Sequence, residues 1–537
     1  MSQHDVVVVG SGAAGLTAAL TAARAGLSVL VLEKTASLGG TSVVSGGSIW
    51  APDNKFLGAA GLRDSREEAL AYLRADSLGR VDDELLEAFL DHVNPMLEVL
   101  LERTGIEFTV NKEHPDYQPG LPGAHVGGRT LQGGLFDTNE LGDLKPKLRA
   151  PHSGVPILKL EIDAWGADTL DRWDWALLAE RTVKGIVGMG SALVGELLRG
   201  CQVLGVDVST ETGAVELLRG SDGRVTGVRT SGPAGDGEAM AARGVVLASG
   251  GFEWSSRLVD QFLGVPMVAP ASPPANVGDG LRMAMDVGAS LGNMSEAWWG
   301  PMIHAVGDTY DQQPLFRPTS GLRTLPGGII VNSRGRRFVN EAMNYNDLGK
   351  ALANFDPGAY EYGNQPCWLV FDQRFRDSYS VATVTPDAPT PRWITKADSL
   401  GELADAVGID AAGLQSQVAE FNEHAAQGRD PEFHRGESVY DTYRGDPTMT
   451  PHRNLRALAD GPYYAVPLIL GCLGTKGGPV TDAQGRVLDA FDRPIPGLVA
   501  CGNVAASPFG PGYPGAGATL AAGMTFGYLG ATALATD

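Results

Sequence analysis

Residues 6–34 read VVVVGSGAAGLTAALTAARAGLSVLVLEK, and this stretch decides the fold class. Val6–Val9 is a β-branched run that predicts a buried strand, and glycines follow it at positions 10, 12 and 15 in a G-x-G-x-x-G pattern. An alanine-rich helical stretch and a second apolar strand, Ser28–Leu32, complete the unit. In this strand–turn–helix–strand context the motif is typical of a dinucleotide-binding site.

The three glycines and an acidic residue have separate roles in such a site. Gly10 permits the tight turn, Gly12 lets backbone N–H groups approach a pyrophosphate, and Gly15 lets the helix lie close to the strand. Glu33 follows the second strand, where its carboxylate can accept hydrogen bonds from a ribose. The cofactor contacts predicted from this unit are Gly10, Gly12, Ala14, Gly15, Glu33 and Lys34.

The next segment favours FAD over NAD as the dinucleotide. Residues 39–48 read GGTSVVSGGS, where an NAD-binding domain would continue with another helix and strand. Small residues allow the backbone to pass close to the pyrophosphate and ring of a flavin, although a flexible surface loop has a similar composition. The predicted contacts in this segment are Gly40, Thr41, Ser42, Gly46 and Gly47.

The C-terminal region predicts a second part of the same cofactor site. Residues 496–503 read PGLVACGN, which indicates a strand running into a turn, and 512–520 read GYPGAGATL, which indicates the start of a helix. The free N–H groups of a helix N-terminus suit a reduced, anionic flavin. With the glycine turn after the apolar run 245–248 and the helix start near 279, the further predicted contacts are Gly250, Asp279, Gly502, Asn503, Ala518 and Leu520.

Composition excludes several classes of protein. The 42 lysines and arginines against 63 acidic residues give a net charge of −21, which argues against binding to nucleic acid or to an anionic membrane. The four cysteines form no C-x-x-C pair, and the nine histidines have no metal-ligand spacing, so neither a thiol redox pair nor a metal site is expected. We expect no signal peptide and no transmembrane segment, and a cytoplasmic location.

The texture of the sequence predicts a domain inserted into another. Glycine turns typical of nucleotide sites are absent from about residue 298 to 472, where aromatic residues become more frequent. We therefore predict a first part of the FAD-binding domain at 1–297, an inserted catalytic domain at 298–472, and the C-terminal part of the FAD-binding domain at 473–537. Within the insertion, 328–338 (GIIVNSRGRRF) predicts a hairpin and 367–371 a strand.

Taken together, these motifs resemble the fumarate reductase and 3-ketosteroid dehydrogenase superfamily of FAD flavoproteins. The matching segments are VVVVGSGAAGLTAAL, LEKTASLGGTSVVSGG, LASGGF, NVGDGLRMA, GGIIVNSRGRRFVNE and CGN. SGGSIWAPDN, PDYQPGLPG and GYPGAGATL resemble the 3-ketosteroid Δ1-dehydrogenase branch in particular. The resemblance implies an α/β fold with a Rossmann-like, GR2-type FAD-binding domain and an inserted α+β catalytic domain.

The resemblance also implies four catalytic residues, because Tyr117, Tyr345, Tyr513 and Gly517 fall on functional positions of that branch. The Tyr513 hydroxyl and the Gly517 N–H would polarise a ketone oxygen. Tyr345, as a tyrosinate with a lowered pKa, would remove the α-proton with a hydrogen bond from Tyr117, while the flavin accepts the β-hydride. The FAD would be non-covalent, since no attachment histidine stands in 39–48.

The substrate class stays open at this point. No arginine accompanies Tyr513 to hold a dicarboxylate, so a neutral, hydrophobic ketone is expected, with 3-ketosteroids first. Residues 139–175 differ from the usual steroid enzyme, which leaves small cyclic ketones such as cyclohexanone derivatives as the alternative. A flavin ene-reductase running in the opposite direction and a non-enzymatic flavin redox sensor are further possibilities. Without an NAD motif of its own, the enzyme would pass electrons to a quinone or another redox partner.

Overall fold

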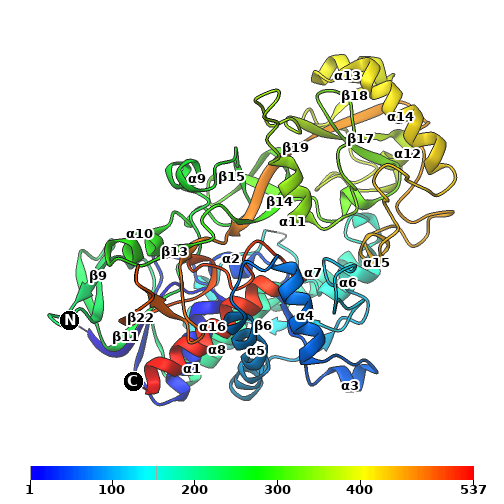
Figure 1. Cartoon of the computed structure of the whole chain (residues 1–537). Helices are drawn as coiled ribbons and strands as arrows, with labels where there is room; N and C mark the ends of the chain where they lie inside the picture. Colours follow the sequence, from blue (N-terminus) through cyan, green and yellow to red (C-terminus); the bar gives the residue numbers. More distant parts are fainter. Residues whose placement is uncertain (1, 153, 537) are drawn as a thin grey trace.

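The computed structural model describes residues 2–152 and 154–536. Figure 1 shows two lobes, with both chain ends in the lower-left lobe and the yellow helices at the far end of the other. Two long strands, β14 (Ala297–Tyr310) and β19 (Tyr463–Thr475), pair with each other and extend from the middle of the molecule into the second lobe. Segments that are far apart in the sequence therefore meet where the two lobes join.

The first lobe is built on an eight-stranded sheet with the order β21-β22-β11-β1-β2-β8, and β9 and β10 extend from β11. Its core is parallel, with Val6 of β1 aligned on Val29 of β2 and on Gly244 of β11. The predicted first strand, helix and second strand are confirmed. The strands are β1 (Ser2–Val9), β2 (Val29–Leu32), β8 (Asp207–Ser209), β9 (Gly213–Arg219), β10 (Val225–Ser231), β11 (Gly237–Leu247), β21 (Arg486–Leu488) and β22 (Pro494–Ala500).

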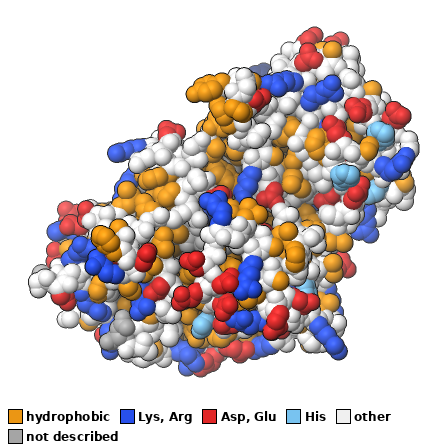
Figure 2. All heavy atoms as spheres, viewed as in Figure 1, with side chains coloured by type: hydrophobic (Ala, Val, Ile, Leu, Met, Phe, Trp, Pro, Cys, Tyr) orange, Lys and Arg blue, Asp and Glu red, His pale blue; other side chains and the backbone are white. Residues whose placement is uncertain are grey.

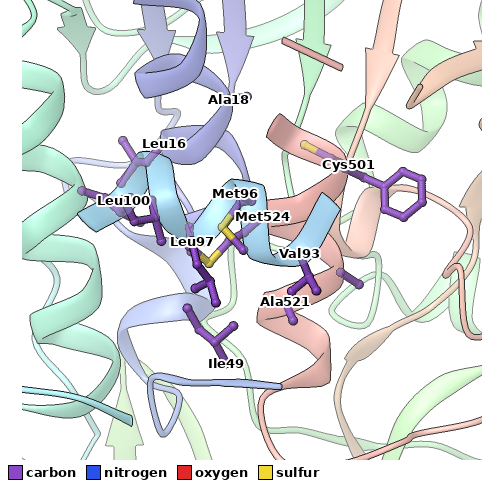
Figure 3. Packing of buried hydrophobic residues seen from close by; sticks show 14 of the residues in the cluster. Leu16, Ala18, Ile49, Val93, Met96, Leu97, Leu100, Cys501, Ala521 and Met524 are labelled. Atoms are coloured by element: carbon purple, nitrogen blue, oxygen red, sulfur yellow. The ribbon is translucent and has the colours of Figure 1, made fainter. Parts of the chain in front are cut away.

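Four helices pack together beside this sheet: α1 (Ala13–Arg24), α5 (Asp83–Arg103), α8 (Met189–Val203) and α16 (Ala518–Thr536). Figure 3 shows apolar side chains of α1, α5 and α16 meeting in this core. The helices approach closely, since a Cβ on Gly527 of α16 would stand 2.6 Å from the carbonyl oxygen of Ala14. Helix α16 is long and apolar enough to cross a membrane, but 67% of it is buried inside the fold.

Residues 40–187 form a layer of short elements over the cofactor side of this lobe. They are α2 (Gly40–Val43), β3 (Ser48–Trp50), α3 (Leu57–Ala60), α4 (Arg66–Asp76), β4 (Phe108–Val110), β5 (Thr130–Gly133), β6 (Phe136–Asp137), a 3-10 helix (Thr138–Lys147), α6 (Lys159–Trp165), a second 3-10 helix (Leu170–Arg172), α7 (Trp175–Lys184) and β7 (Ile186–Val187).

The second lobe is built on a seven-stranded sheet with the order β15-β14-β19-β17-β16, and β12 and β18 also pair with β19. Its further strands are β12 (Ala269–Pro270), β15 (Gln313–Pro318), β16 (Gly328–Asn332), β17 (Cys367–Asp372) and β18 (Thr395–Ala397). Its helices include α11 (Tyr345–Leu352), α12 (Gln373–Ser378), α13 (Leu400–Val407), α14 (Ala411–Ala425) and α15 (Val439–Tyr443). The exact domain boundaries stay a prediction.

The remaining elements are short. They are α9 (Ser256–Phe262), α10 (Asp279–Asp286), β13 (Leu291–Gly292), two 3-10 helices (Leu322–Thr324 and Gly502–Val504) and β20 (Gly478–Pro479). Figure 2 shows charged side chains of both signs over the visible face, with hydrophobic side chains gathered along the waist between the lobes.

The predicted hairpin at 328–338 is wrong. Only β16 forms there, and it pairs with β17 rather than with the residues that follow it. The chain turns after Asn332 and inserts Arg337 into a buried cluster, where its guanidinium donates to Glu341 and Asp430 at 2.7 Å. Two buried carboxylates for one guanidinium outweigh the propensity of the segment for a second strand.

Candidate active site

A cavity of about 400 Å³ lies where the first lobe meets β14, α11 and the C-terminal segment. All four predicted catalytic residues line it, and so do the predicted cofactor contacts with two exceptions. Those that line it are Gly10, Gly12, Ala14, Glu33, Lys34, Gly40, Thr41, Ser42, Gly46, Gly47, Gly250, Asp279, Gly502, Asn503 and Leu520. The fold therefore brings residues from both ends of the chain to one site.

The two exceptions, Gly15 and Ala518, lie behind the cavity wall. A Cβ on Gly15 would stand 2.2 Å from the carbonyl oxygen of Gly10, so this glycine lets α1 pack against the turn. Ala518 is fully buried at the start of α16. Both residues shape the wall rather than face the cavity.

The first turn of α1 fits a phosphate group. Gly12 is the N-cap residue, and the turn contains no acidic side chain that would occupy its positive end. A Cβ on Gly40 or Gly46 would meet no atom within 4 Å, so these backbone segments border open space. Ser42 accepts a hydrogen bond from the Ala13 N–H at 2.9 Å and fixes the glycine segment against the helix.

Glu33 is buried at the ribose end of the predicted cofactor site, with 8% of its surface exposed. Its carboxylate accepts hydrogen bonds from the Ser11 hydroxyl at 2.7 Å and from the Thr35 N–H at 2.9 Å. The Thr35 hydroxyl at 2.9 Å and the Ser11 N–H at 3.4 Å also donate to it, so four hydrogen bonds hold the carboxylate at the cavity wall. Ser11, which sequence reasoning missed, also accepts from the Gly39 N–H at 2.9 Å and ties the two glycine segments together.

Three tyrosines from distant segments meet at the other end of the cavity. The Tyr117 hydroxyl donates to the Tyr345 hydroxyl at 3.1 Å, and the Tyr345 hydroxyl donates to that of Tyr513 at 2.9 Å. Their ring centroids lie 4.9–5.6 Å apart. The three hydroxyls therefore form one hydrogen-bonded chain.

The backbone around each tyrosine explains this arrangement. Tyr117 lies in a loop, and its backbone N–H donates to the carbonyl of Pro514, the residue after Tyr513, at 3.0 Å. Tyr345 is the first residue of α11, and the N-cap side chain of Asn344 accepts from the Asp347 N–H at 3.0 Å. The same Asn344 amide donates to the Tyr117 carbonyl at 3.3 Å, so the helix start is bound to the loop.

Tyr513 has additional partners that the sequence did not indicate. Its hydroxyl shares a hydrogen bond with Thr519 at 3.0 Å, and its ring packs edge-on against Trp298 at 4.6 Å. The buried Lys476 ammonium lies 4.2 Å from the Trp298 ring and donates to the Gly512 carbonyl at 2.6 Å. A hydrogen bond from the Lys476 side chain therefore holds the loop that carries Tyr513.

Gly517 adopts a conformation that only glycine takes easily. Its φ is +94°, and a Cβ would stand 2.5 Å from the carbonyl carbon of Ser48. Within residues 2–152 and 154–536 its N–H has no hydrogen-bond acceptor, although it lines the cavity directly before α16. This N–H is free to bind an oxygen atom in the cavity.

The tyrosines are protonated in the resting site, and the expectation of a lowered pKa for Tyr345 is wrong. Burial raises the pKa of Tyr345 well above its ordinary value, and the neighbouring Tyr117 and Tyr513 raise it further. Burial likewise raises the pKa of Tyr117 and of Tyr513. Desolvation outweighs hydrogen bonding because it disfavours the charged phenolate.

Sequence reasoning missed a polar wall beyond Tyr117. His114, Lys159 and Arg444 line the same cavity. The His114 ring lies 4.7 Å from the ring of Tyr443 and 6.3 Å from that of Tyr117. Lys159 and Arg444 come from segments without a recognisable motif, whereas His114 directly precedes the PDYQPGLPG segment and could have been included with it.

One group of possible metal ligands lies outside the cavity. Ligand atoms of Asp64, Glu68 and His125 are within 4.8 Å of one another. Asp64 already accepts from the buried guanidinium of Arg129 at 2.7 Å, so its charge is compensated by the protein.

The fold and the glycine-bordered cavity define a dinucleotide-binding protein. The sequence model of one family, described as FAD binding domain, matches residues 5–520. Among curated proteins, the chain is 43% identical to a 4-oxocyclohexanecarboxylate 2-dehydrogenase of Sinomonas cyclohexanicum, over 99% of this chain and 93% of that one. It is 39% identical to a 3-oxosteroid 1-dehydrogenase of Mycolicibacterium smegmatis, over 99% and 97% of the two chains.

A solved structure agrees with these matches. The crystal structure of 3-ketosteroid Δ1-dehydrogenase from Sterolibacterium denitrificans, in complex with 1,4-androstadiene-3,17-dione, has a TM-score of 0.93 and 36% identity, with full coverage of both chains. The chain belongs to the FAD-binding flavoprotein family, in the branch of the fumarate reductase superfamily that includes the 3-ketosteroid Δ1-dehydrogenases. It is an FAD-dependent oxidoreductase acting on CH–CH groups, and the predicted fold class and cofactor are confirmed.

Proposed function

We propose that this enzyme desaturates a ring ketone next to its carbonyl group. The observation that carries the proposal is the hydrogen-bonded chain of Tyr117, Tyr345 and Tyr513 in one cavity with the free N–H of Gly517. Desaturation needs a polarised carbonyl, a base for the α-proton and an acceptor for the β-hydride. Bound FAD supplies the hydride acceptor, and the remaining tasks fall to this chain.

The Tyr513 hydroxyl and the Gly517 N–H polarise the ketone oxygen. Both groups line the cavity, and three residues separate them along the loop that leads into α16. As negative charge develops on the ketone oxygen, two donors in a buried site stabilise it, each by about 3 kcal/mol. Tyr513 is held for this task by Thr519 and Trp298.

Tyr345 accepts the α-proton after releasing its own to solvent. In the resting site its hydroxyl donates to Tyr513 and accepts from Tyr117. Once deprotonated, its oxygen accepts from Tyr117, and a hydrogen bond to the charged form lowers a pKa. The one O–H of Tyr513 is then free to donate to the ketone oxygen. Removing the α-proton and the β-hydride leaves the carbon–carbon double bond conjugated with the ketone.

Two substrate classes follow from the relatives. The 3-oxosteroid 1-dehydrogenases support 3-ketosteroids, such as androst-4-ene-3,17-dione, which would gain a 1,2 double bond. The 4-oxocyclohexanecarboxylate 2-dehydrogenase supports a small ring ketone. A quinone or another redox partner would reoxidise the flavin. The opposite direction, as an ene-reductase, would use the same cavity.

Anaerobic bleaching of the flavin tests the reaction. The purified enzyme is mixed with 3-ketosteroids, cyclohexanone derivatives and fumarate, and the absorbance of oxidised flavin is followed. We expect ketones with an α,β C–H pair to bleach it and to yield the enone. Activity confined to fumarate with a reduced donor would contradict the proposal. Denaturation should release free FAD, since a non-covalent cofactor is expected.

A further inference from the structure

The guanidinium of Arg444 has donors that the protein leaves unused. Arg444 directly follows α15 and lines the cavity. Its side chain makes no hydrogen bond or ion pair with residues 2–152 or 154–536, and its Nε is buried without an acceptor. An arginine side chain offers five N–H donors and stays charged, so an unpaired one in a cavity wall can bind an anionic group of a ligand.

The charges around Arg444 do not cancel it. Lys159 lines the same wall, but its ammonium pairs with the Asp163 carboxylate, whose other oxygen accepts from the Asn111 amide at 3.0 Å. His114 adds no charge, because burial lowers its pKa well below its ordinary value. Burial raises the pKa of Asp168, a further neighbouring acid, to about 7. Among the described residues, Arg444 therefore has no carboxylate within ion-pair distance.

Aromatic rings connect this charge to the proposed ketone site. The Arg444 guanidinium lies 5.3 Å from the Tyr443 ring, and that ring contacts His114, which in turn contacts Tyr117. The hydroxyl of Tyr117 bonds to Tyr345. A ring ketone held by Tyr513 and Gly517 would thus share its cavity with an unpaired cation.

We propose that Arg444 forms a carboxylate subsite, so that the substrate is a ring ketone bearing a carboxylate. This inference rests on the proposed function. A carboxylate can accept two parallel N–H bonds from a guanidinium, whereas a neutral steroid brings no charge to this wall. The two polar groups of a keto acid would then be bound at separate places: the ketone by Tyr513 and Gly517, and the carboxylate by Arg444.

The test compares an acid with its neutral ester. Holoenzymes of the wild type, Arg444→Gln and Arg444→Lys are titrated anaerobically with 4-oxocyclohexanecarboxylate, its methyl ester and androst-4-ene-3,17-dione. We expect the wild type to prefer the acid. Arg444→Gln should raise the Kd of the acid roughly 10- to 100-fold, the effect of losing a charged hydrogen-bonding partner, and leave the ester unchanged.

Two controls keep the result specific. Arg334→Gln removes the same charge at an exposed site, where Arg334 pairs with Glu361, and should leave both Kd values unchanged. If Arg444→Gln loses FAD, Arg444→Lys is used in its place, because lysine keeps the charge but lacks the planar pair of donors. We then expect the Kd of the acid to rise roughly 10-fold.

The outcomes separate this inference from the proposed function. Equal Kd values for the acid in wild type and Arg444→Gln, or a wild-type preference for the ester or the steroid, would overturn the subsite. If no ketone bleaches the flavin, the proposed function fails. The subsite can then still be measured by calorimetry with cyclohexanecarboxylate, which has no ketone. This acid should bind to the wild type and more weakly to Arg444→Gln. Equal affinities for the two proteins would overturn the subsite.

Discussion

Replacing Tyr345 with phenylalanine tests the proposed base most directly. The change removes one hydroxyl, which donates to Tyr513 at 2.9 Å and accepts from Tyr117 at 3.1 Å. The ring contacts at 5.5 and 5.6 Å remain, so the cavity keeps its shape. Loss of a general base lowers a rate by about 10²- to 10⁴-fold, or about 3–5 kcal/mol in activation free energy.

Substrate binding should change much less. The ketone oxygen is held by Tyr513 and Gly517, and losing neutral hydrogen bonds costs about 0.5–1.5 kcal/mol each. We therefore expect a collapse of the rate of flavin reduction at saturating substrate, with a Kd changed by less than about tenfold. Stopped-flow bleaching under anaerobic conditions gives both quantities from one concentration series.

The pH dependence adds an independent check. Burial raises the pKa of Tyr345, so below that pKa the protonated, inactive form dominates and the reactive tyrosinate fraction grows with pH. The wild-type rate should rise from neutral to alkaline pH, and Tyr345→Phe should be flat. Near wild-type reduction by Tyr345→Phe, or an unchanged pH slope in that variant, would refute the reasoning and move the base to another residue.

Three further predictions concern the cofactor, the ketone site and the fold. Glu33→Ala should weaken FAD binding by about 1–3 kcal/mol in a fluorescence titration, and an unchanged Kd would exclude the ribose contact. Gly517→Ala should lower kcat by about 100-fold or more with FAD retained, because φ is +94° at this position and the N–H would shift. Wild-type turnover would show that the Gly517 N–H does not bind the ketone oxygen. Arg337→Met should lower the free energy of unfolding by about 3–5 kcal/mol in urea, since it leaves the buried Asp430 without a cation and Glu341 with Arg435 alone, and a loss below about 1 kcal/mol would contradict this.

Local patterns were sufficient to predict the cofactor half of the molecule. The strand, glycine turn and helix at 6–24 are short-range features, and the position of Glu33 follows from them. The junction of Tyr117, Tyr345 and Tyr513 could be expected only through the family resemblance, since hundreds of residues separate them. Their functional roles stay predictions.

Other features depend on tertiary contacts that no local pattern carries. The pKa of Tyr345 is set by burial among other rings, so a sequence motif gave the wrong direction. The failed hairpin at 328–338 depends on Asp430, about a hundred residues further on. Arg444 and Lys159 stand in segments without a motif, and only the folded cavity brings them to one wall.

The shared cofactor site of the two chain ends has a consequence for synthesis. Strand β22 pairs with β11, which pairs with β1, and α16 packs against α1. A nascent chain that has left the ribosome only to β19 lacks Gly502, Gly517 and the whole of α16. The cofactor site is therefore incomplete until α16 has been translated. FAD capture should follow the synthesis of this helix, and shortening α16 should abolish flavin incorporation in cells even though the glycine motif is intact.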